Sequence, residues 1–228
     1  MSKVVQVSLR WTWIGGAALL GVLGGLSFAS IGLGGWNASL QRQAGDLRRE
    51  IDSLVRERQG LDRQALLLVA IERVVPDVDD ATTALVAREI DRNATLYGFD
   101  PLVILAVVVT ESGIRVSAQG RYVSGNASGA QGVMQIKPAT ARTMAQALGM
   151  DEPDDAQLHD PSYNLAVGVA YLLQMVHRFQ DLRLGIMAYN VGPTALMNML
   201  RDDRALPEAY YRKVWLTYRK LSRGLERR

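Results

Sequence analysis

One carboxylic acid, Glu111, stands at the end of an apolar stretch in the middle of the chain. It closes the run 104–110 and is followed at once by Ser112 and Gly113. Desolvation by the neighbouring valines and the partial negative charge of a helix C-terminus would both raise the pKa of this carboxyl. An acid that keeps its proton near neutral pH is suited to protonate a glycosidic oxygen. Glu111 is therefore the candidate catalytic residue.

The acidic residues nearest in sequence narrow the chemistry further. The stretch 112–150 contains no Asp or Glu. A glycosidase that uses two carboxylates needs the second one several ångströms from the first. None is offered locally, although folding could bring Asp151, Asp154 or Asp160 close to Glu111.

A glycine-bearing loop is the second candidate part of a site. Residues 128–135 contain Gly129 and Gly132, which allow the backbone to approach a ligand closely, and they lead into a helix start at Pro138. Gln135, at the end of this loop, is placed to offer its amide to a sugar.

A third segment ends in a helix-breaking sequence. The apolar residues 184–188 run into Tyr189 and Asn190, and Val-Gly-Pro follows at 191–193. This breaker leaves both polar side chains at a helix terminus. There the phenol of Tyr189 could donate a hydrogen bond to Glu111 or to a reacting sugar.

The elements that must position these residues are predicted to be helices joined by short connections. Asp100-Pro101 begins the helix that ends near Glu111, and Asp160-Pro161 begins another that runs to about Phe179. Pro76 ends a long N-terminal helix, and the aspartates at 77–80 cap the next one. The predicted fold class is all-α.

Four groups of residues, in this order, resemble the motifs of the soluble-lytic-transglycosylase (SLT) domain, a lysozyme-like family. The resemblance extends from about Asp80 to Tyr218. The residues that carry it are Glu111-Ser112, Gly132-Val133-Met134-Gln135 with Pro138-Ala139-Thr140-Ala141, Asn164 with Gly168 and Tyr171-Leu172, and Ala188-Tyr189-Asn190-Val191-Gly192-Pro193.

This resemblance implies non-hydrolytic cleavage of the β-1,4 bond between N-acetylmuramic acid and N-acetylglucosamine in peptidoglycan. A 1,6-anhydromuramyl end is the product. In the family a single glutamate acts as acid and then as base, while the N-acetyl group of the substrate stabilises the cationic centre. The implied substrate-site residues beside Glu111 are Ser112 and Gln135, which orient the glutamate or hold the sugar, Met134, which lines the groove, Tyr189, near the reacting centre, and Asn190, which ties the helix end to the core.

Two segments depart from the family pattern. The connection after Ser112 is about six residues longer than usual, through 120–126, and borders the expected groove. Near the C-terminus, residues 207–214 match the closing helix of the family only loosely. We assign this second segment a packing role.

The N-terminal part of the chain predicts a membrane location. After a short segment 1–10, residues 11–36 contain no charge and would form a helix about 39 Å long, enough to cross a bilayer core of about 30 Å. Trp11, Trp13 and Trp36 bracket it like interfacial anchors. The alternative is a cleaved signal peptide with its cleavage site at 27–29. A peptidoglycan substrate would place the C-terminal domain on the periplasmic side of the inner membrane, behind a single span.

A heptad pattern occupies residues 38–75. Leucines recur every seven residues from Leu40 to Leu68, and Arg58 interrupts the alternate seam positions. The pattern predicts a coiled-coil stalk, most simply a parallel homodimer. A single amphipathic helix packed on the domain or on a partner helix is the alternative.

Composition limits the remaining possibilities. The chain has no cysteine, so neither a lipid-attachment cysteine nor a disulfide is available. His159 and His177 lack a ligand-spaced third group, and no phosphate-binding or nucleic-acid motif appears. We therefore expect no metal, no cofactor and no nucleic-acid partner.

Residues 77–228 are the predicted catalytic domain, with peptidoglycan strands and the membrane as its partners. Two rival functions remain. One is a hydrolytic lysozyme, which would need a spatially close second carboxylate. The other is a structural component of a wall-crossing assembly, in which catalysis is incidental.

Overall fold

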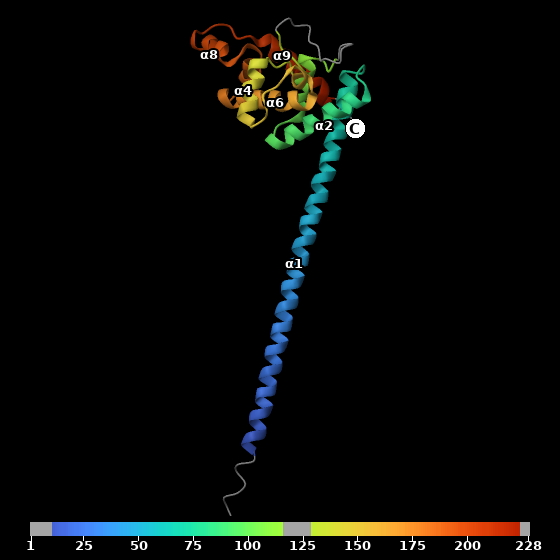
Figure 1. Cartoon of the computed structure of the whole chain (residues 1–228), viewed down its shortest axis with the longest axis vertical. Helices are drawn as coiled ribbons and strands as arrows, with labels where there is room; N and C mark the ends of the chain where they lie inside the picture. The colour runs from blue at the N-terminus through green and yellow to red at the C-terminus, as the bar shows by residue number, and fades with distance from the viewer. Residues whose placement is uncertain (1–10, 116–128, 224–228) are drawn as a thin grey trace, which may run out of the picture. The chain divides into compact units, whose positions relative to one another are not determined.

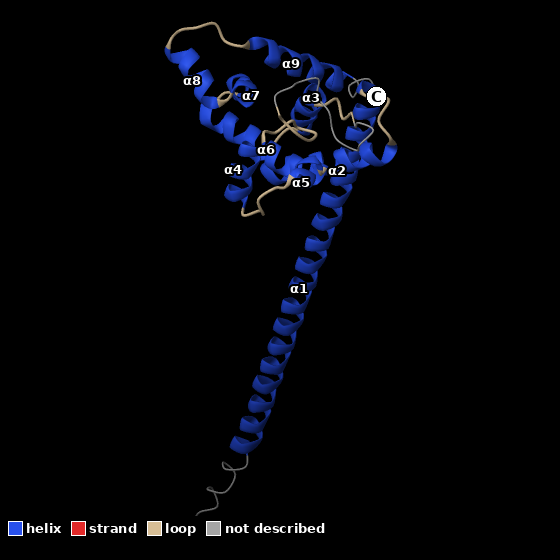
Figure 2. Cartoon of the chain, turned by 45° about the horizontal axis from the view of Figure 1, so that its top comes forward, coloured by secondary structure: helices blue, strands red, loops and turns tan. Residues whose placement is uncertain are grey.

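The computed structural model describes residues 11–115 and 129–223, with side chains from residue 41 onward except that of Ala44. Within these residues every regular element is a helix (Figure 2), and the all-α prediction is confirmed for them. The chain divides into two units, Met1–Gln59 and Gly60–Arg228. The inserted residues of the loop 120–126 and the N-terminal segment 1–10 lie outside the described residues.

The first helix, α1 (Trp11–Val74), continues without a break through the predicted stalk and ends two residues before Pro76. Leu47, Ile51, Leu54 and Leu61 each expose more than half of their surface along it. The helical state of the stalk region is thus confirmed, and its pairing with a second helix stays a prediction.

A membrane span is not seen in the described part of the chain, where no helix is both long enough and apolar enough to cross a bilayer. The predicted span, residues 11–36, lies outside the residues whose side chains the structure describes.

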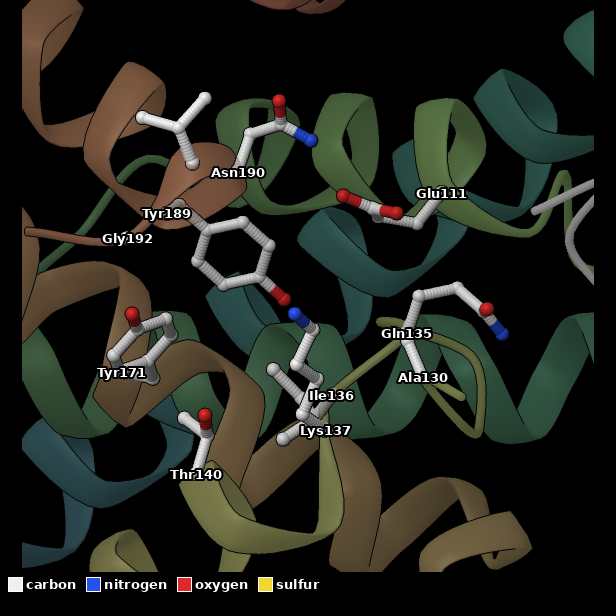
Figure 3. A pocket seen from close by; sticks show the side chains of 11 residues that line it. Glu111, Ala130, Gln135, Ile136, Lys137, Thr140, Tyr171, Tyr189, Asn190 and Gly192 are labelled. Atoms are coloured by element: carbon white, nitrogen blue, oxygen red, sulfur yellow. The ribbon is translucent and has the colours of Figure 1, made fainter. Parts of the chain in front are cut away.

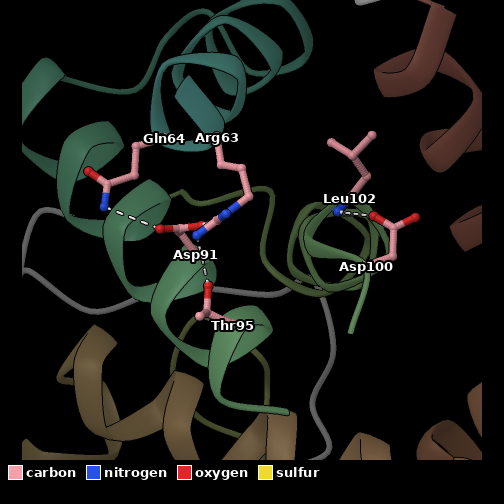
Figure 4. A network of polar contacts seen from close by, with 6 residues as sticks. All are labelled: Arg63, Gln64, Asp91, Thr95, Asp100 and Leu102. Atoms are coloured by element: carbon pink, nitrogen blue, oxygen red, sulfur yellow. Dashed lines mark hydrogen bonds and ion pairs between the residues drawn. The ribbon is translucent and has the colours of Figure 1, made fainter. Parts of the chain in front are cut away.

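The second unit begins at Gly60, earlier than the start predicted at residue 77. The last turns of α1 belong to this unit because Leu67, Ala70 and Ile71 are buried in its core. Arg63 also bonds Asp91 of the next helix, with 2.7 Å between Nε and Oδ1 (Figure 4). The end of the predicted stalk is therefore part of the folded domain.

Within the described residues, eight further helices belong to the domain. Several of them are labelled in Figure 1. Aspartate side chains cap three of them as predicted: Asp79 accepts from Thr82 N–H, Asp100 from Leu102 N–H, and Asp160 from Tyr163 N–H. The helices are α2 (Asp80–Tyr97), α3 (Pro101–Glu111), α4 (Pro138–Leu148), α5 (Asp155–His159), α6 (Pro161–Phe179), α7 (Leu182–Val191), α8 (Pro193–Arg201) and α9 (Glu208–Arg223).

Two packing relations position the site. The first involves α3, whose residues Val103 to Val108 are all buried, so that Glu111 at its end is held by a rigid element. Helix α9, although distant in sequence, packs along α3. The second relation centres on α6, which packs against α2, α4, α5 and α7 and thereby joins the helices that surround the remaining site residues.

Candidate active site

A cavity of about 230 Å³ opens at the C-terminal end of α3. Its wall comes from the end of α3, the loop before α4, the start of α4, the middle of α6 and the end of α7 (Figure 3). The lining residues are Glu111, Ala130, Gln135, Ile136, Lys137, Thr140, Tyr171, Tyr189, Asn190, Val191 and Gly192. Three separate segments predicted from sequence thus meet around one space.

Glu111 lies partly buried in the wall of this cavity. Burial raises the pKa of its carboxyl to about 7, and a hydrogen bond from Tyr210 acts in the opposite direction. The Tyr210 hydroxyl donates to Glu111 Oε1 over 2.6 Å. Burial and the nearby Glu111 in turn raise the pKa of Tyr210 well above its usual value, so the phenol remains a donor. The site therefore holds a carboxyl group that gains and loses its proton near neutral pH.

The contact from Tyr210 corrects the role assigned to residues 207–214. This segment begins α9, and the packing of α9 along α3 brings Tyr210 to Glu111 across 99 positions of sequence. Tyr210 is not among the lining residues of the cavity, and its hydroxyl contacts Glu111 from behind the cavity wall. Periodicity places Tyr210 on the inner face of α9, but it does not reveal which helix that face meets.

Tyr189 lines the cavity, but its hydroxyl is used elsewhere than predicted. It donates to the backbone oxygen of Met134 over 2.7 Å and does not bond Glu111. Burial, followed by the Glu111 charge, raises the pKa of Tyr189 well above the usual tyrosine value. Tyr189 thus ties α7 to the loop before α4 and presents its ring to the cavity beside Tyr171, with ring centroids 5.4 Å apart.

Ser112 was expected to orient the glutamate or hold the sugar, and Met134 to line the groove as part of the substrate site. The structure buries both side chains in the core. The Ser112 hydroxyl donates to Val133 O over 2.8 Å and accepts from Ile114 N–H, so it joins the end of α3 to the loop. Met134 packs against Gly168 of α6, where an added Cβ would lie 2.6 Å from its sulfur. Both residues support the cavity wall from behind.

Gln135 does reach the cavity, and its backbone adopts the left-handed conformation with φ of 52°. This conformation is uncommon for a residue other than glycine and is concentrated at functional sites. One amide hydrogen of its side chain bonds Gly132 O over 2.8 Å. The second amide hydrogen and the carbonyl oxygen have no hydrogen-bond partner among the described residues, so they could meet a ligand.

The loop that carries Gln135 is fixed by the buried side chain of Asn164. Its Oδ1 accepts from Met134 N–H over 2.8 Å, and its Nδ2 donates to Leu158 O over 2.8 Å. Gly132 makes this approach possible, because it has φ of 78° and an added Cβ would lie 2.0 Å from Asn164 Nδ2. Asn164 and Gly132 therefore hold the loop rather than bind a ligand.

Asn190 is exposed at the rim of the cavity, where it lies with Gly192 at the end of α7. The expectation that it ties the helix end to the core does not hold, since its side chain faces the cavity (Figure 3). It is a candidate ligand contact.

The candidates for a second carboxylate do not line the cavity. The carboxylates of Asp154 and Asp160 cap helices α5 and α6, and Asp151 is exposed. Among the described residues Glu111 is the one carboxylate of the lining. In the same part of the chain, no three His, Asp or Glu side chains gather as metal ligands would.

The sequence model of the Transglycosylase SLT domain matches residues 88–211, more than half of the chain. The chain belongs to this family. The match confirms the resemblance inferred from the motifs, and it includes both Glu111 and Tyr210.

Curated relatives of this SLT-domain protein carry related names. It is 31% identical over 124 residues to the endo-type membrane-bound lytic murein transglycosylase A of Klebsiella pneumoniae (strain 342), covering 50% of this chain and 58% of that one. It is 33% identical over 96 residues to the transglycosylase of Enterobacteria phage PRD1, covering 42% and 31%. The chain thus spans less than two thirds of each of these relatives.

A solved structure is similar over part of the SLT-domain protein. An inactive mutant of the lytic transglycosylase Slt from Pseudomonas aeruginosa has a TM-score of 0.44 and 26% identity. The alignment covers 68% of this chain and 24% of that one.

Proposed function

We propose that this protein is a peptidoglycan lytic transglycosylase that cleaves the bond between N-acetylmuramic acid and N-acetylglucosamine without water. One observation carries the proposal: among the described residues the cavity lining holds one carboxylate, Glu111, whose pKa is about 7. The family and the names of its relatives agree with this chemistry.

Glu111 would act twice in the reaction. Its protonated carboxyl first gives its proton to the glycosidic oxygen, and the bond from C1 to that oxygen breaks. The N-acetyl group of the substrate stabilises the cationic C1. The Glu111 carboxylate then removes the proton from the C6 hydroxyl, whose oxygen bonds C1 to close the 1,6-anhydro ring. A pKa near the operating pH serves both proton transfers.

The neighbouring side chains would support these two steps differently. Tyr210 donates to the carboxylate and therefore favours the ionised state that the second step requires. Gln135 and Asn190 line the cavity and would hold sugar substituents, and the rings of Tyr171 and Tyr189, tilted by 47° to each other, would add an aromatic wall.

A hydrolytic lysozyme of the two-carboxylate type fits this cavity less well. It requires a second carboxyl group to act as nucleophile or to activate water. The lining within the described residues offers none, and residues 112–150 contain no acidic side chain.

Mass spectrometry of the products tests the proposal. Full-length wild-type protein should release anhydromuropeptides from purified peptidoglycan, and Glu111→Gln should release none. Asp151→Asn is the matched control, since this exposed carboxylate lies outside the cavity and should not be needed. Hydrated reducing ends from wild type would instead establish a lysozyme, and equal products from Glu111→Gln would remove Glu111 from the mechanism.

We also infer a single-span anchor at residues 11–36, a periplasmic catalytic domain and a paired stalk. The uncharged N-terminal stretch and the membrane-bound relatives support the anchor. The exposed Leu47, Ile51, Leu54 and Leu61 along α1 support pairing of the stalk, most simply with a second copy. Carbonate extraction of membranes, followed by cross-linking at Leu54→Cys, tests both features. Release of the chain by carbonate or absence of a cross-linked dimer would contradict them.

A further inference from the structure

A positive charge also lies in the cavity. Lys137 is the one basic residue of the lining within the described part of the chain. Its side chain extends into the cavity below Tyr189 in the view of Figure 3. When Glu111 is protonated and ready to act as the acid, it carries no charge. Among the described lining residues, Lys137 is then the one charged group.

Lys137 is exposed, and the helix end on which it stands does not favour a lysine. Lys137 is the N-cap of α4, and its side chain makes no capping hydrogen bond. The N-terminus of a helix carries partial positive charge, so a cation there is unfavourable for the helix. Asn, Asp, Ser or Thr would be preferred.

The Lys137 ammonium group also has no paired acidic side chain, in the part of the chain that the structure describes, that would account for its position. Within the described residues no acidic side chain pairs with Lys137, whereas arginines such as Arg63 and Arg183 do form ion pairs there. The pKa of Glu111 follows from burial and from Tyr210, and Lys137 takes no part in it. The ammonium group is therefore available to a ligand in the cavity.

We propose that Lys137 recognises a carboxylate of the peptide that is attached to the glycan strand. The inference rests on the proposed function and names the part of the substrate that this wall selects. N-acetylmuramic acid bears its peptide through a lactyl group, so peptide carboxylates accompany the sugar into the cavity. Lys137 is then a specificity-determining residue, and a strand with neutral peptides binds less tightly.

A binding measurement tests this without turnover. Full-length Glu111→Gln protein is titrated with a soluble peptide-bearing glycan oligosaccharide, and with the same compound after its peptide carboxylates are converted to carboxamides. We expect about fivefold tighter binding of the carboxylate form, corresponding to about 1 kcal/mol. Adding Lys137→Met should abolish the preference, whereas adding Lys213→Met, at an exposed lysine outside the cavity, should retain it. Equal affinities in the Glu111→Gln protein, or a preference that survives Lys137→Met, would overturn the inference.

A second variant separates recognition from a structural role. Lys137→Asn introduces a preferred N-cap residue, so the thermal stability should stay the same or rise while the preference is lost. A loss of stability would show that Lys137 serves the fold. Because binding is read in the absence of catalysis, a chain that proves not to form anhydro products would still support or overturn the role of Lys137.

Discussion

The junction between α1 and α2 and the cavity at the end of α3 each contain a carboxylate. The two carboxylates differ in the groups that contact them. At the junction, Asp91 exposes 7% of its side chain and is met by a cation, Arg63, at 2.7 Å. Gln64 donates to its other oxygen over 3.3 Å (Figure 4). In the cavity, Glu111 receives a neutral phenol from Tyr210.

The different partners give the two carboxylates different roles: Asp91 is suited to hold helices together, and Glu111 is suited to proton transfer. A cation, Arg63, and an amide, that of Gln64, hold the Asp91 carboxylate at the α1–α2 contact. A phenol offsets only part of the desolvation of Glu111, so burial prevails and the pKa rises to about 7. The domain therefore pairs one buried carboxylate with a cation, and leaves the Glu111 carboxyl able to exchange its proton near neutral pH.

The largest expected effect is the loss of folding stability caused by the raised pKa of Glu111. The pKa of Glu111 is raised from 4.5 to about 7, so its contribution to stability is fully present below pH 4.5 and is lost as pH rises through 7. The full loss corresponds to about 3 kcal/mol. Glu111→Gln has no such titration and should be more stable than wild type by about that amount at about pH 9.

Urea unfolding of the two proteins across this pH range measures the difference in the free energy of unfolding. The difference should shrink toward pH 4.5, and all other titrating groups cancel in the comparison. A constant difference, or a wild type that is the more stable protein at high pH, would mean that Glu111 is not held in a costly state.

The Arg63–Asp91 pair should show an asymmetric response to mutation. Arg63 exposes 39% of its side chain and can be rehydrated when it loses its partner, whereas Asp91 cannot. Arg63→Met should lower the free energy of unfolding by about 2 kcal/mol, and Asp91→Asn by about 1 kcal/mol. A double-mutant cycle on denaturation midpoints measures both values and the coupling between them. Equal losses would indicate that the pair is effectively solvated, and lost activity in the folded variants would link the junction to the cavity.

Much of this arrangement could be predicted from local sequence. Asp100-Pro101 and Asp160-Pro161 marked the starts of α3 and α6, because capping chemistry acts within a few residues. The apolar run before Glu111 likewise indicated that the carboxyl is desolvated, because the residues that surround it are its neighbours in sequence. The prediction of a raised pKa needed only the neighbours of Glu111 in its own helix.

The residues that sequence reasoning misplaced depend on contacts between distant segments. Ser112 and Met134 adjoin site residues in sequence, yet their side chains lie in the core. There Ser112 donates a hydrogen bond to Val133 O, and Met134 packs against Gly168. The start of the domain at Gly60 likewise depends on where Ile71 packs. Polarity and spacing do not reveal which side of a loop or helix will face a cavity.

Tyr210 is the clearest case, and its replacement gives the smallest but most specific effect. Tyr210→Phe removes the hydrogen bond that lowers the pKa of Glu111, so this pKa should rise further. The decline of kcat/KM on the alkaline side, where the acid loses its proton, should move to higher pH. The second step, which needs the carboxylate, should slow by about fivefold, or about 1 kcal/mol.

Tyr218→Phe is the matched control for Tyr210→Phe, since it removes a hydroxyl from the same helix. That hydroxyl bonds Asp100 at the other end of α3 over 3.0 Å. The control should leave the pH profile of kcat/KM in place, because Asp100 caps the start of α3 and does not line the cavity. If both variants shift the profile equally, the packing of α9 on α3 sets the pKa of Glu111. If neither variant shifts it, burial alone does so, and the phenol is not what distinguishes Glu111 from Asp91.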